Sequence, residues 1–287
     1  MSGAAGGPGD NPWQDNRGNK DRSITRSSVA GGDGMAHAVA GGRGAAGGPR
    51  LEGGAFLTGD QMTGGYGATD ILHACTIEAH AGEIAVIVGP NGAGKSTAMK
   101  AIFGMLKLRG GGVRIGGEEI THLSPQDRVA KGMAFVPQTN NVFPSMTVEE
   151  NLEMGAFLRR DDISGTMSQV YELFPILKEK RRQAAGELSG GQRQQVAVGR
   201  ALMTQPKVLM LDEPTAGVSP IVMDELFDRI VEVARTGITI LMVEQNARQA
   251  LEIANRGYVL VQGKNAYTGT GAELLANPEV RRTFLGG

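Results

Sequence analysis

The chain has 287 residues, of which 40% are hydrophobic, and its 29 basic and 30 acidic side chains give a formal net charge of −1 at pH 7. This balance excludes a nucleic-acid binder that depends on bulk positive charge, because phosphate neutralisation needs clustered Lys and Arg. The single cysteine excludes an intrachain disulfide, and no run approaches the roughly 18 consecutive apolar residues of a membrane span, so we expect a soluble chain.

Residues 1–54 hold 15 of the 44 glycines. They show no apolar periodicity, and runs such as GGRGAAGGPR offer too few side chains for burial to offset the entropy of ordering. We therefore predict that residues 1–54 are a disordered tail. Trp13 in this tail could anchor a partner, but an incidental exposed residue is the simpler interpretation.

From residue 55 onward, short apolar runs alternate with helical patterns. Four runs rich in Val, Ile and Leu predict strands buried on both faces of a parallel sheet: Glu83–Val88, Lys207–Asp212, Ile238–Val243 and Gly257–Gln262. Asp224–Arg235 carries an apolar stripe with the period of a helix. This alternation indicates an α/β domain that binds its ligand at the carboxyl ends of the strands.

Residues 140–187 have a different pattern, because they contain helical segments and no candidate strand. Thr147 and Glu150 have the spacing of a capping box for a helix that ends near Leu158. We predict that this block is a helical subdomain inserted in the sheet domain.

A phosphate-binding loop follows the first predicted strand. The sequence GPNGAGKST fills every fixed position of the pattern G-x-x-x-x-G-K-[ST] with Gly89, Pro90, Asn91, Gly92, Ala93, Gly94, Lys95, Ser96 and Thr97. Glycines let the backbone N–H groups surround phosphate oxygens, and the helix that follows presents its positive N-terminal end. Lys95 supplies a cation for the β- and γ-phosphates, and Ser96 offers a hydroxyl ligand to Mg²⁺.

Two adjacent carboxylates end the second predicted strand, in the sequence VLMLDEPT. Asp212 is placed to reach Mg²⁺ directly or through water. Glu213 points to the opposite face of the strand and can orient and polarise an attacking water. Acidic pairs also end strands without binding anything, but a complete phosphate loop in the same chain favours the functional interpretation.

A second candidate anion site lies in the sequence LSGGQRQQVAVGRAL, where Ser189, Gly190 and Gly191 begin a helix. A second such helix terminus is redundant in a chain with one phosphate loop, unless it faces the phosphates of another subunit. An ordinary helix cap is the alternative, since Ser-Gly-Gly is common at that position.

The order GPNGAGKS, LSGGQ, LDEPT resembles the nucleotide-binding subunit of an ABC transporter, over residues 55–287. The resemblance implies an α/β P-loop NTPase core with a mostly parallel sheet, an N-terminal antiparallel β region and an inserted helical subdomain. It also implies ATP and Mg²⁺ as cofactors and a head-to-tail dimer, homo- or heteromeric, around two ATP molecules. In that dimer Ser189, Gly190, Gly191 and Gln192 act on the ATP bound to the partner chain.

Further roles follow from the same resemblance. Gln138, in FVPQ, stands where the family has a glutamine that contacts Mg²⁺ and attacking water, and Tyr66 stands where an aromatic ring stacks on adenine; an ordinary edge-strand aromatic is the alternative for Tyr66. Gln245 replaces the usual histidine beside the γ-phosphate, so we expect it to hold phosphate or water without relaying a proton. Ser219 replaces a common aspartate before Pro220, a departure that bears on the cross-subunit contacts of that loop.

The segments VEQNARQALEIANRGYVLVQG, AGVSP and EVRRTFLGG resemble the ATP-binding subunits of branched-chain amino-acid importers. The resemblance implies ATP hydrolysis that powers uptake of branched-chain or other polar amino acids. Import of urea or short-chain amides is one alternative, and a non-transport ABC ATPase that acts as a mechanical or regulatory module is another.

The partners implied are permease subunits that dock around Gln138–Glu153 and, indirectly, a periplasmic or extracellular substrate-binding protein, with no nucleic acid. The implied location is the cytoplasmic face of the inner membrane, peripheral through the permease. Outside these motifs, Cys75 fits strand packing better than nucleophilic chemistry, and His73 and His80 fit ordinary histidines better than metal ligands.

Overall fold

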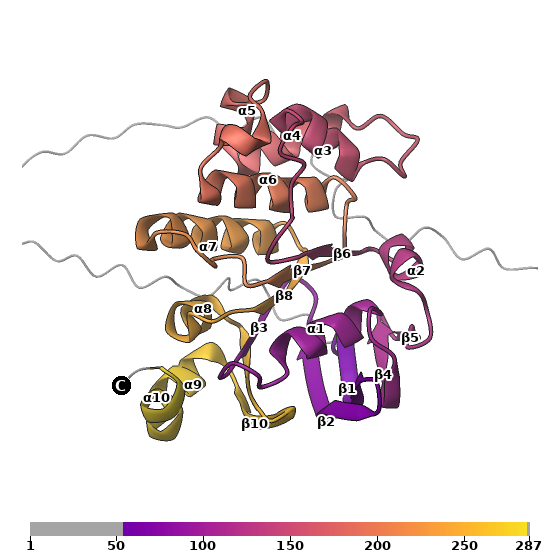
Figure 1. Cartoon of the computed structure of the whole chain (residues 1–287), viewed down its shortest axis with the longest axis vertical. Helices are drawn as coiled ribbons and strands as arrows, with labels where there is room; N and C mark the ends of the chain where they lie inside the picture. Colours follow the sequence, from indigo (N-terminus) through magenta and orange to yellow (C-terminus); the bar gives the residue numbers. More distant parts are fainter. Residues whose placement is uncertain (1–53, 286–287) are drawn as a thin grey trace, which may run out of the picture. The chain divides into compact units, whose positions relative to one another are not determined.

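The computed structural model describes residues 54–285. The predicted tail, including Trp13 and excepting Gly54, therefore lies outside the described residues. The described residues form two sheets and the helices around them (Figure 1). Within this part of the chain, no helix combines the length and the apolar character needed to cross a bilayer.

The smaller sheet is antiparallel and has the order β2-β1-β4-β5. Its strands are β1 (Leu57–Tyr66), β2 (Thr69–Ala79), β4 (Leu108–Ile115) and β5 (Glu118–Glu119). The predicted N-terminal antiparallel β region is thus confirmed, although half of this sheet comes from residues after the phosphate loop. The apolar pattern did not indicate β4, because three consecutive glycines interrupt it.

The larger sheet has the order β10-β9-β3-β8-β7-β6 and is parallel except for β10 at its edge. Its strands are β3 (Ile84–Val88), β6 (Met133–Val136), β7 (Val208–Asp212), β8 (Thr239–Val243), β9 (Arg256–Val261) and β10 (Lys264–Gly269). The four predicted strands match β3, β7, β8 and β9 to within one residue at each end. Every residue of β3, β7 and β8 is buried, which confirms strands covered on both faces.

The helices occupy the connections between these strands. They are α1 (Lys95–Phe103), α2 (Pro125–Ala130), α3 (Val148–Gly155), α4 (Ser164–Leu173), α5 (Pro175–Glu179), α6 (Gly190–Leu202), α7 (Pro220–Arg235), α8 (Ala247–Ile253), α9 (Gly271–Ala276) and α10 (Pro278–Phe284), with a short 3₁₀ turn at Ala185–Glu187. Helix α7 begins four residues before the predicted start, because Pro220 occupies its first turn, where the missing N–H costs nothing.

The block between β6 and α6 contains α3, α4 and α5 and no named strand. The capping box at α3 is confirmed, since Thr147 Oγ1 accepts a hydrogen bond from Glu150 N and Thr147 N donates to the Glu150 carboxylate, at 3.2 and 2.7 Å. The helix ends at Gly155 rather than near Leu158. The extent of a separate helical subdomain stays a prediction.

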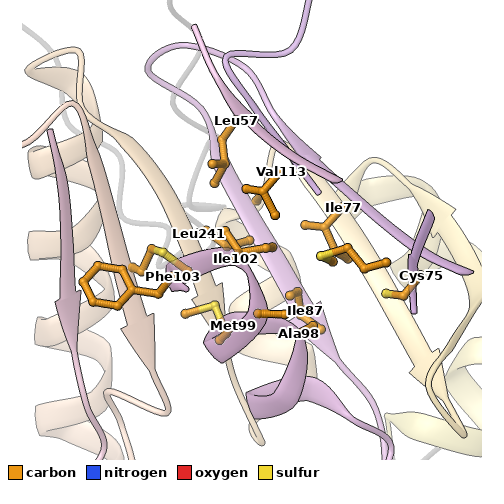
Figure 2. Packing of buried hydrophobic residues seen from close by; sticks show 14 of the residues in the cluster. Leu57, Cys75, Ile77, Ile87, Ala98, Met99, Ile102, Phe103, Val113 and Leu241 are labelled. Atoms are coloured by element: carbon orange, nitrogen blue, oxygen red, sulfur yellow. The ribbon is translucent and has the colours of Figure 1, made fainter. Parts of the chain in front are cut away.

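Helix α1 packs between the two sheets and joins them into one core. Figure 2 shows part of this cluster, with Ala98, Met99, Ile102 and Phe103 from α1, Ile87 and Leu241 from the larger sheet, and Leu57, Cys75, Ile77 and Val113 from the smaller one. Because α1 starts at the phosphate loop, the position of that loop depends on both sheets.

Cys75 belongs to this core and is fully buried. Burial raises the pKa of its thiol to about 12, so almost no reactive thiolate forms near neutral pH. The interpretation as strand packing is confirmed. His73 is exposed, and no group of three or more His, Cys, Asp or Glu residues within the described residues could hold a metal ion.

Arg128, on α2, is buried with a relative exposure of 1%. Its guanidinium donates only to backbone carbonyls: Ala101 O at 3.1 Å, Ile102 O at 2.6 Å, Thr121 O at 2.7 Å and Leu123 O at 3.2 Å. Two of these carbonyls belong to the last turn of α1, where a cation also complements the helix dipole. Arg128 thus holds the end of α1 opposite the phosphate loop.

We expect the Arg128→Leu variant to lose about 2–4 kcal/mol of unfolding free energy, because four carbonyls lose a donor, in two cases from a buried hydrogen bond. Urea unfolding followed by circular dichroism would measure the loss. The matched control is Arg114→Leu, which removes an exposed pair with Glu119 and should change stability by less than about 1 kcal/mol. Equal unfolding midpoints for the two variants would show that Arg128 does not hold α1.

Candidate functional site

The site lies where the parallel strands end. β3, β8, β7 and β6 are neighbours in the larger sheet and run in the same direction, so their carboxyl ends meet at one edge. The phosphate loop follows β3, the acidic pair ends β7, Gln138 follows β6 and Gln245 follows β8. The fold therefore brings together four segments that are far apart in the sequence.

The phosphate loop is shaped by close backbone approaches. Gly89 has φ 144°, and a Cβ atom there would lie 2.2 Å from Leu260 O in β9. Gly94 has φ 96° and is the N-cap of α1, so the helix begins at Lys95 and its N-terminal end faces the loop. Glycine is needed at both positions, because an L side chain rarely adopts these φ values.

The ammonium group of Lys95 lies inside the loop. It donates to Gly89 O at 2.9 Å and to Pro90 O at 3.3 Å. Burial lowers the pKa of Lys95, and the nearby carboxylates of Glu213, Asp212 and Glu244 oppose that shift. The loop therefore holds a poorly solvated cation, which is an effective partner for phosphate.

Ser96 and Asp212 form a pair of oxygen ligands beside Lys95. Ser96 Oγ donates to Asp212 Oδ1 at 3.1 Å, across the gap between α1 and β7. Burial raises the pKa of Asp212, while the bond from Ser96 and the charges of Lys100 and Lys95 oppose the shift. A hydroxyl and a carboxylate are the hard oxygen donors that Mg²⁺ prefers, so the residues present fit that ion.

Glu213 and Gln138 meet from neighbouring strands. Gln138 Nε2 donates to Glu213 Oε2 at 2.9 Å. Glu213 has φ 48°, an uncommon value for a non-glycine residue, and its backbone N–H donates to Val243 O of β8 at 2.9 Å. An uncommon backbone conformation, combined with a side chain held by a neighbouring amide, is typical of residues in functional sites.

The second candidate anion site begins α6. Ser189 is its N-cap and forms a capping box with Gln192, while Ser189 and Gly190 are exposed. Gly191 is buried, and a Cβ atom there would lie 2.0 Å from Val222 Cγ1, so α7 also requires glycine at this position. No hydrogen bond within residues 54–285 joins these residues to the phosphate loop. Figure 1 draws the α6 and α1 helices in separate parts of the fold.

Three other predicted residues lie on the surface. Tyr66 ends β1 and is 53% exposed, and Gln245 and Ser219 are also exposed. Ser219 is the N-cap of α7, although its side chain makes no capping hydrogen bond. Adenine stacking by Tyr66 and phosphate contact by Gln245 stay predictions.

Sequence reasoning missed Glu244, a buried carboxylate that directly follows β8. It accepts hydrogen bonds from Thr215, which lies two residues after Glu213. The sequence carried a signal for it, because Glu244, like Asp212, is a carboxylate at the end of a continuous apolar run. Asn141 and Gln194 were also missed; Asn141 Nδ2 donates to Gln194 Oε1 at 2.7 Å and ties the segment after Gln138 to α6.

These residues define a nucleotide-binding domain of the phosphate-loop class. Residues 72–216 match the family described as ABC transporter. The chain is 45% identical over 233 residues to the high-affinity branched-chain amino acid transport ATP-binding protein BraG of Pseudomonas aeruginosa, covering 81% of this chain and 100% of that protein. It is 41% identical to the probable branched-chain amino acid transport ATP-binding protein LivF of Archaeoglobus fulgidus, covering 79% of this chain and 97% of that protein.

Among solved structures, the chain is similar to the ADP conformation of an ATP-binding cassette of an ABC transporter. The TM-score is 0.74 at 30% identity, and the match covers 81% of this chain and 99% of the other. The chain therefore belongs to the ABC transporter family. It is an ATP-binding subunit of a transporter complex and an ATPase, with the predicted P-loop NTPase fold.

We expect Gly89→Ala to weaken ATP binding by at least about tenfold, because a Cβ at 2.2 Å from Leu260 O forces the loop away from β9. Titration with a fluorescent ATP analogue would measure the dissociation constant. Gly117→Ala is the matched control, since Gly117 also has a positive φ, 82°, but a Cβ there meets no atom within 4 Å. An unchanged dissociation constant for Gly89→Ala would contradict the role of this close approach.

Proposed function

We propose that this chain is the ATP-hydrolysing subunit of an importer for branched-chain or other polar amino acids. The relative named for that transport is matched over its full length at 45% identity, which supports the substrate class. The cytoplasmic face of the membrane is the location where such a subunit meets both ATP and its membrane partners. The observation that carries the catalytic part is the contact between Gln138 and Glu213 beside the Ser96–Asp212 pair.

The residues at the carboxyl ends of the parallel strands have different roles in hydrolysis. The loop N–H groups and Lys95 bind the β- and γ-phosphates, and Ser96, Asp212 and Gln138 would hold Mg²⁺. The ion, when bound, neutralises charge on the phosphate oxygens. Glu213 orients water toward the γ-phosphorus and accepts its proton. Gln138 holds the Glu213 carboxylate at the distance seen here, 2.9 Å.

A second ATPase subunit completes each site. Ser189 and Gly190 are exposed at the start of α6, where the backbone N–H groups and the helix dipole favour an anion. These residues would contact the γ-phosphate bound to the partner, so that ATP joins the two subunits and hydrolysis releases them.

An apolar surface supports docking to permease subunits. Of the seven large hydrophobic side chains exposed in residues 54–285, four lie between residues 143 and 158: Phe143, Met154, Phe157 and Leu158. Asn151 ties their loop and helix together, donating to Phe143 O at 3.0 Å and accepting from Phe143 N at 2.8 Å. Exposed apolar side chains are typical of interaction sites, and these four lie in a stretch of the chain that overlaps the region Gln138–Glu153 and continues past α3.

We expect Glu213→Gln to lower the ATPase rate of the assembled transporter by at least about 100-fold, because the amide cannot accept the proton of water. Leucine uptake into vesicles containing the transporter should fall with it, while ATP binding persists. Glu225→Gln, an exposed change on α7, is the control. ATP turnover that survives Glu213→Gln would contradict the catalytic role, and vesicles that take up urea but no amino acid would contradict the substrate class.

The paired change Phe157→Ser and Leu158→Ser should separate this subunit from its permease. We expect at least about tenfold loss of co-purification and of leucine uptake, because the two side chains, 76% and 78% exposed, would be buried by the partner. The dissociation constant for ATP should not change. Met105→Ser removes another exposed apolar side chain, 52% exposed, and should leave both measurements intact. Co-purification that resists the paired change would place the permease elsewhere.

A further inference from the structure

Glu244 is the least exposed carboxylate at the carboxyl ends of the parallel strands, with a relative exposure of 1%. Its Oε1 accepts a hydrogen bond from Thr215 N at 3.0 Å. Its Oε2 accepts from Thr215 Oγ1 at 2.9 Å and from Gln245 N at 3.1 Å. The side chain therefore joins two loops, the one that follows β7 and the one that follows β8.

A buried carboxylate is costly unless its hydrogen bonds and charge partners offset the loss of water. No ion pair with Glu244 is found within the described residues, although the charge of Glu244 is one of those that oppose the lowering of the Lys95 pKa. Burial raises the pKa of Glu244, and the bonds from Thr215, Gln245 and Asn246 oppose the shift. None of the chemistry proposed above uses this group, so its burial calls for another explanation.

Of the two residues that Glu244 holds, Thr215 is close in sequence to the proposed catalytic Glu213, and Gln245 is itself a predicted site residue. Thr215 lies two positions after Glu213, and Gln245 directly follows Glu244. Asn246 Nδ2 also donates to Thr215 Oγ1, at 3.0 Å, so the hydroxyl is held from both sides. On the other side of the Glu213 Cα atom, the backbone N–H of Glu213 donates to Val243 O, in β8. The strained backbone of Glu213 is thus fixed to the end of β8 on either side.

We infer that Glu244 is a positioning residue, which fixes Glu213 and Gln245 relative to each other and thereby controls hydrolysis rather than ATP binding. This inference rests on the proposed role of Glu213. Displacement of a catalytic group by about 1 Å can cost on the order of 100-fold in rate. The link explains why a carboxylate is needed, because one ionised carboxylate accepts all three bonds without offering a donor of its own.

An amide at residue 244 breaks this arrangement with little change in shape. In Glu244→Gln, the single oxygen can accept from one side only, and the NH₂ group faces a backbone N–H. Thr215→Val removes the hydroxyl at constant volume and leaves the backbone bond to Glu244 intact. Thr215→Ser keeps the hydroxyl and tests whether the bond, rather than the methyl group, matters.

The experiment compares these variants in the assembled transporter. We expect Glu244→Gln and Thr215→Val to lower kcat by at least about tenfold, with KM and the ATP dissociation constant within about twofold of the original protein. Thr215→Ser should restore kcat. The double variant should be no slower than the slower single variant, because both changes break one link.

The control for simple destabilisation is Thr166→Val. Thr166 lies on α4, outside the segments that form the site, and is 3% exposed. Its hydroxyl accepts hydrogen bonds from Arg159 and Gln205. It should lower Tm by a similar amount without changing kcat. The inference is overturned if kcat is unchanged in Glu244→Gln and Thr215→Val, or if Thr166→Val lowers kcat as much as they do.

Failure of this inference is distinguishable from failure of the proposed function. If Glu213→Gln abolishes turnover and the Glu244 and Thr215 variants retain it, only the positioning role of Glu244 is wrong. If Glu213→Gln itself keeps its turnover, Glu213 is not the catalytic carboxylate, and both proposals are wrong together.

Discussion

The site depends on charged side chains that are kept out of water where the parallel strands end. Lys95, Asp212 and Glu244 are all buried there, and burial shifts the pKa of each toward the neutral form, downward for the lysine and upward for the carboxyls. The carboxylates attract the lysine, and donors from Ser96 and Thr215 stabilise the carboxylates. The same desolvation makes these charges strong, because little water screens them from a phosphate group.

Helix α1 makes that arrangement rigid. Its N-terminal end carries Lys95 and Ser96, its apolar face fills the space between the two sheets, and Arg128 satisfies carbonyls in its last turn. The helix can therefore neither slide nor tilt without opening the core or leaving buried carbonyls unpaired. The position of Lys95 at the start of α1 therefore depends on contacts at the other end of the same helix.

Local patterns made the motifs and the central strands predictable, whereas the contacts between distant segments were not. The phosphate loop and β7 could be predicted from the sequence, because glycine spacing and continuous apolar runs are local signals. β4 and β6 were not, since one is rich in glycine and the other has only four residues at the edge of its sheet. Arg128 bonds to residues 26 and 27 positions away, and Glu244 bonds to a residue 29 positions away. No sequence period marks such partners.

The segment that begins at Gln138 shows how the sheet edge connects to the helices beyond it. At one end Gln138 contacts Glu213, and three residues later Asn141 donates to Gln194 of α6. The Nε2 atom of Gln194 is buried and has no hydrogen-bond partner within residues 54–285, so this junction carries an unmet donor. Because Ser189 caps α6, the segment that begins at Gln138 connects the carboxylate at one site to the helix end proposed to face the other.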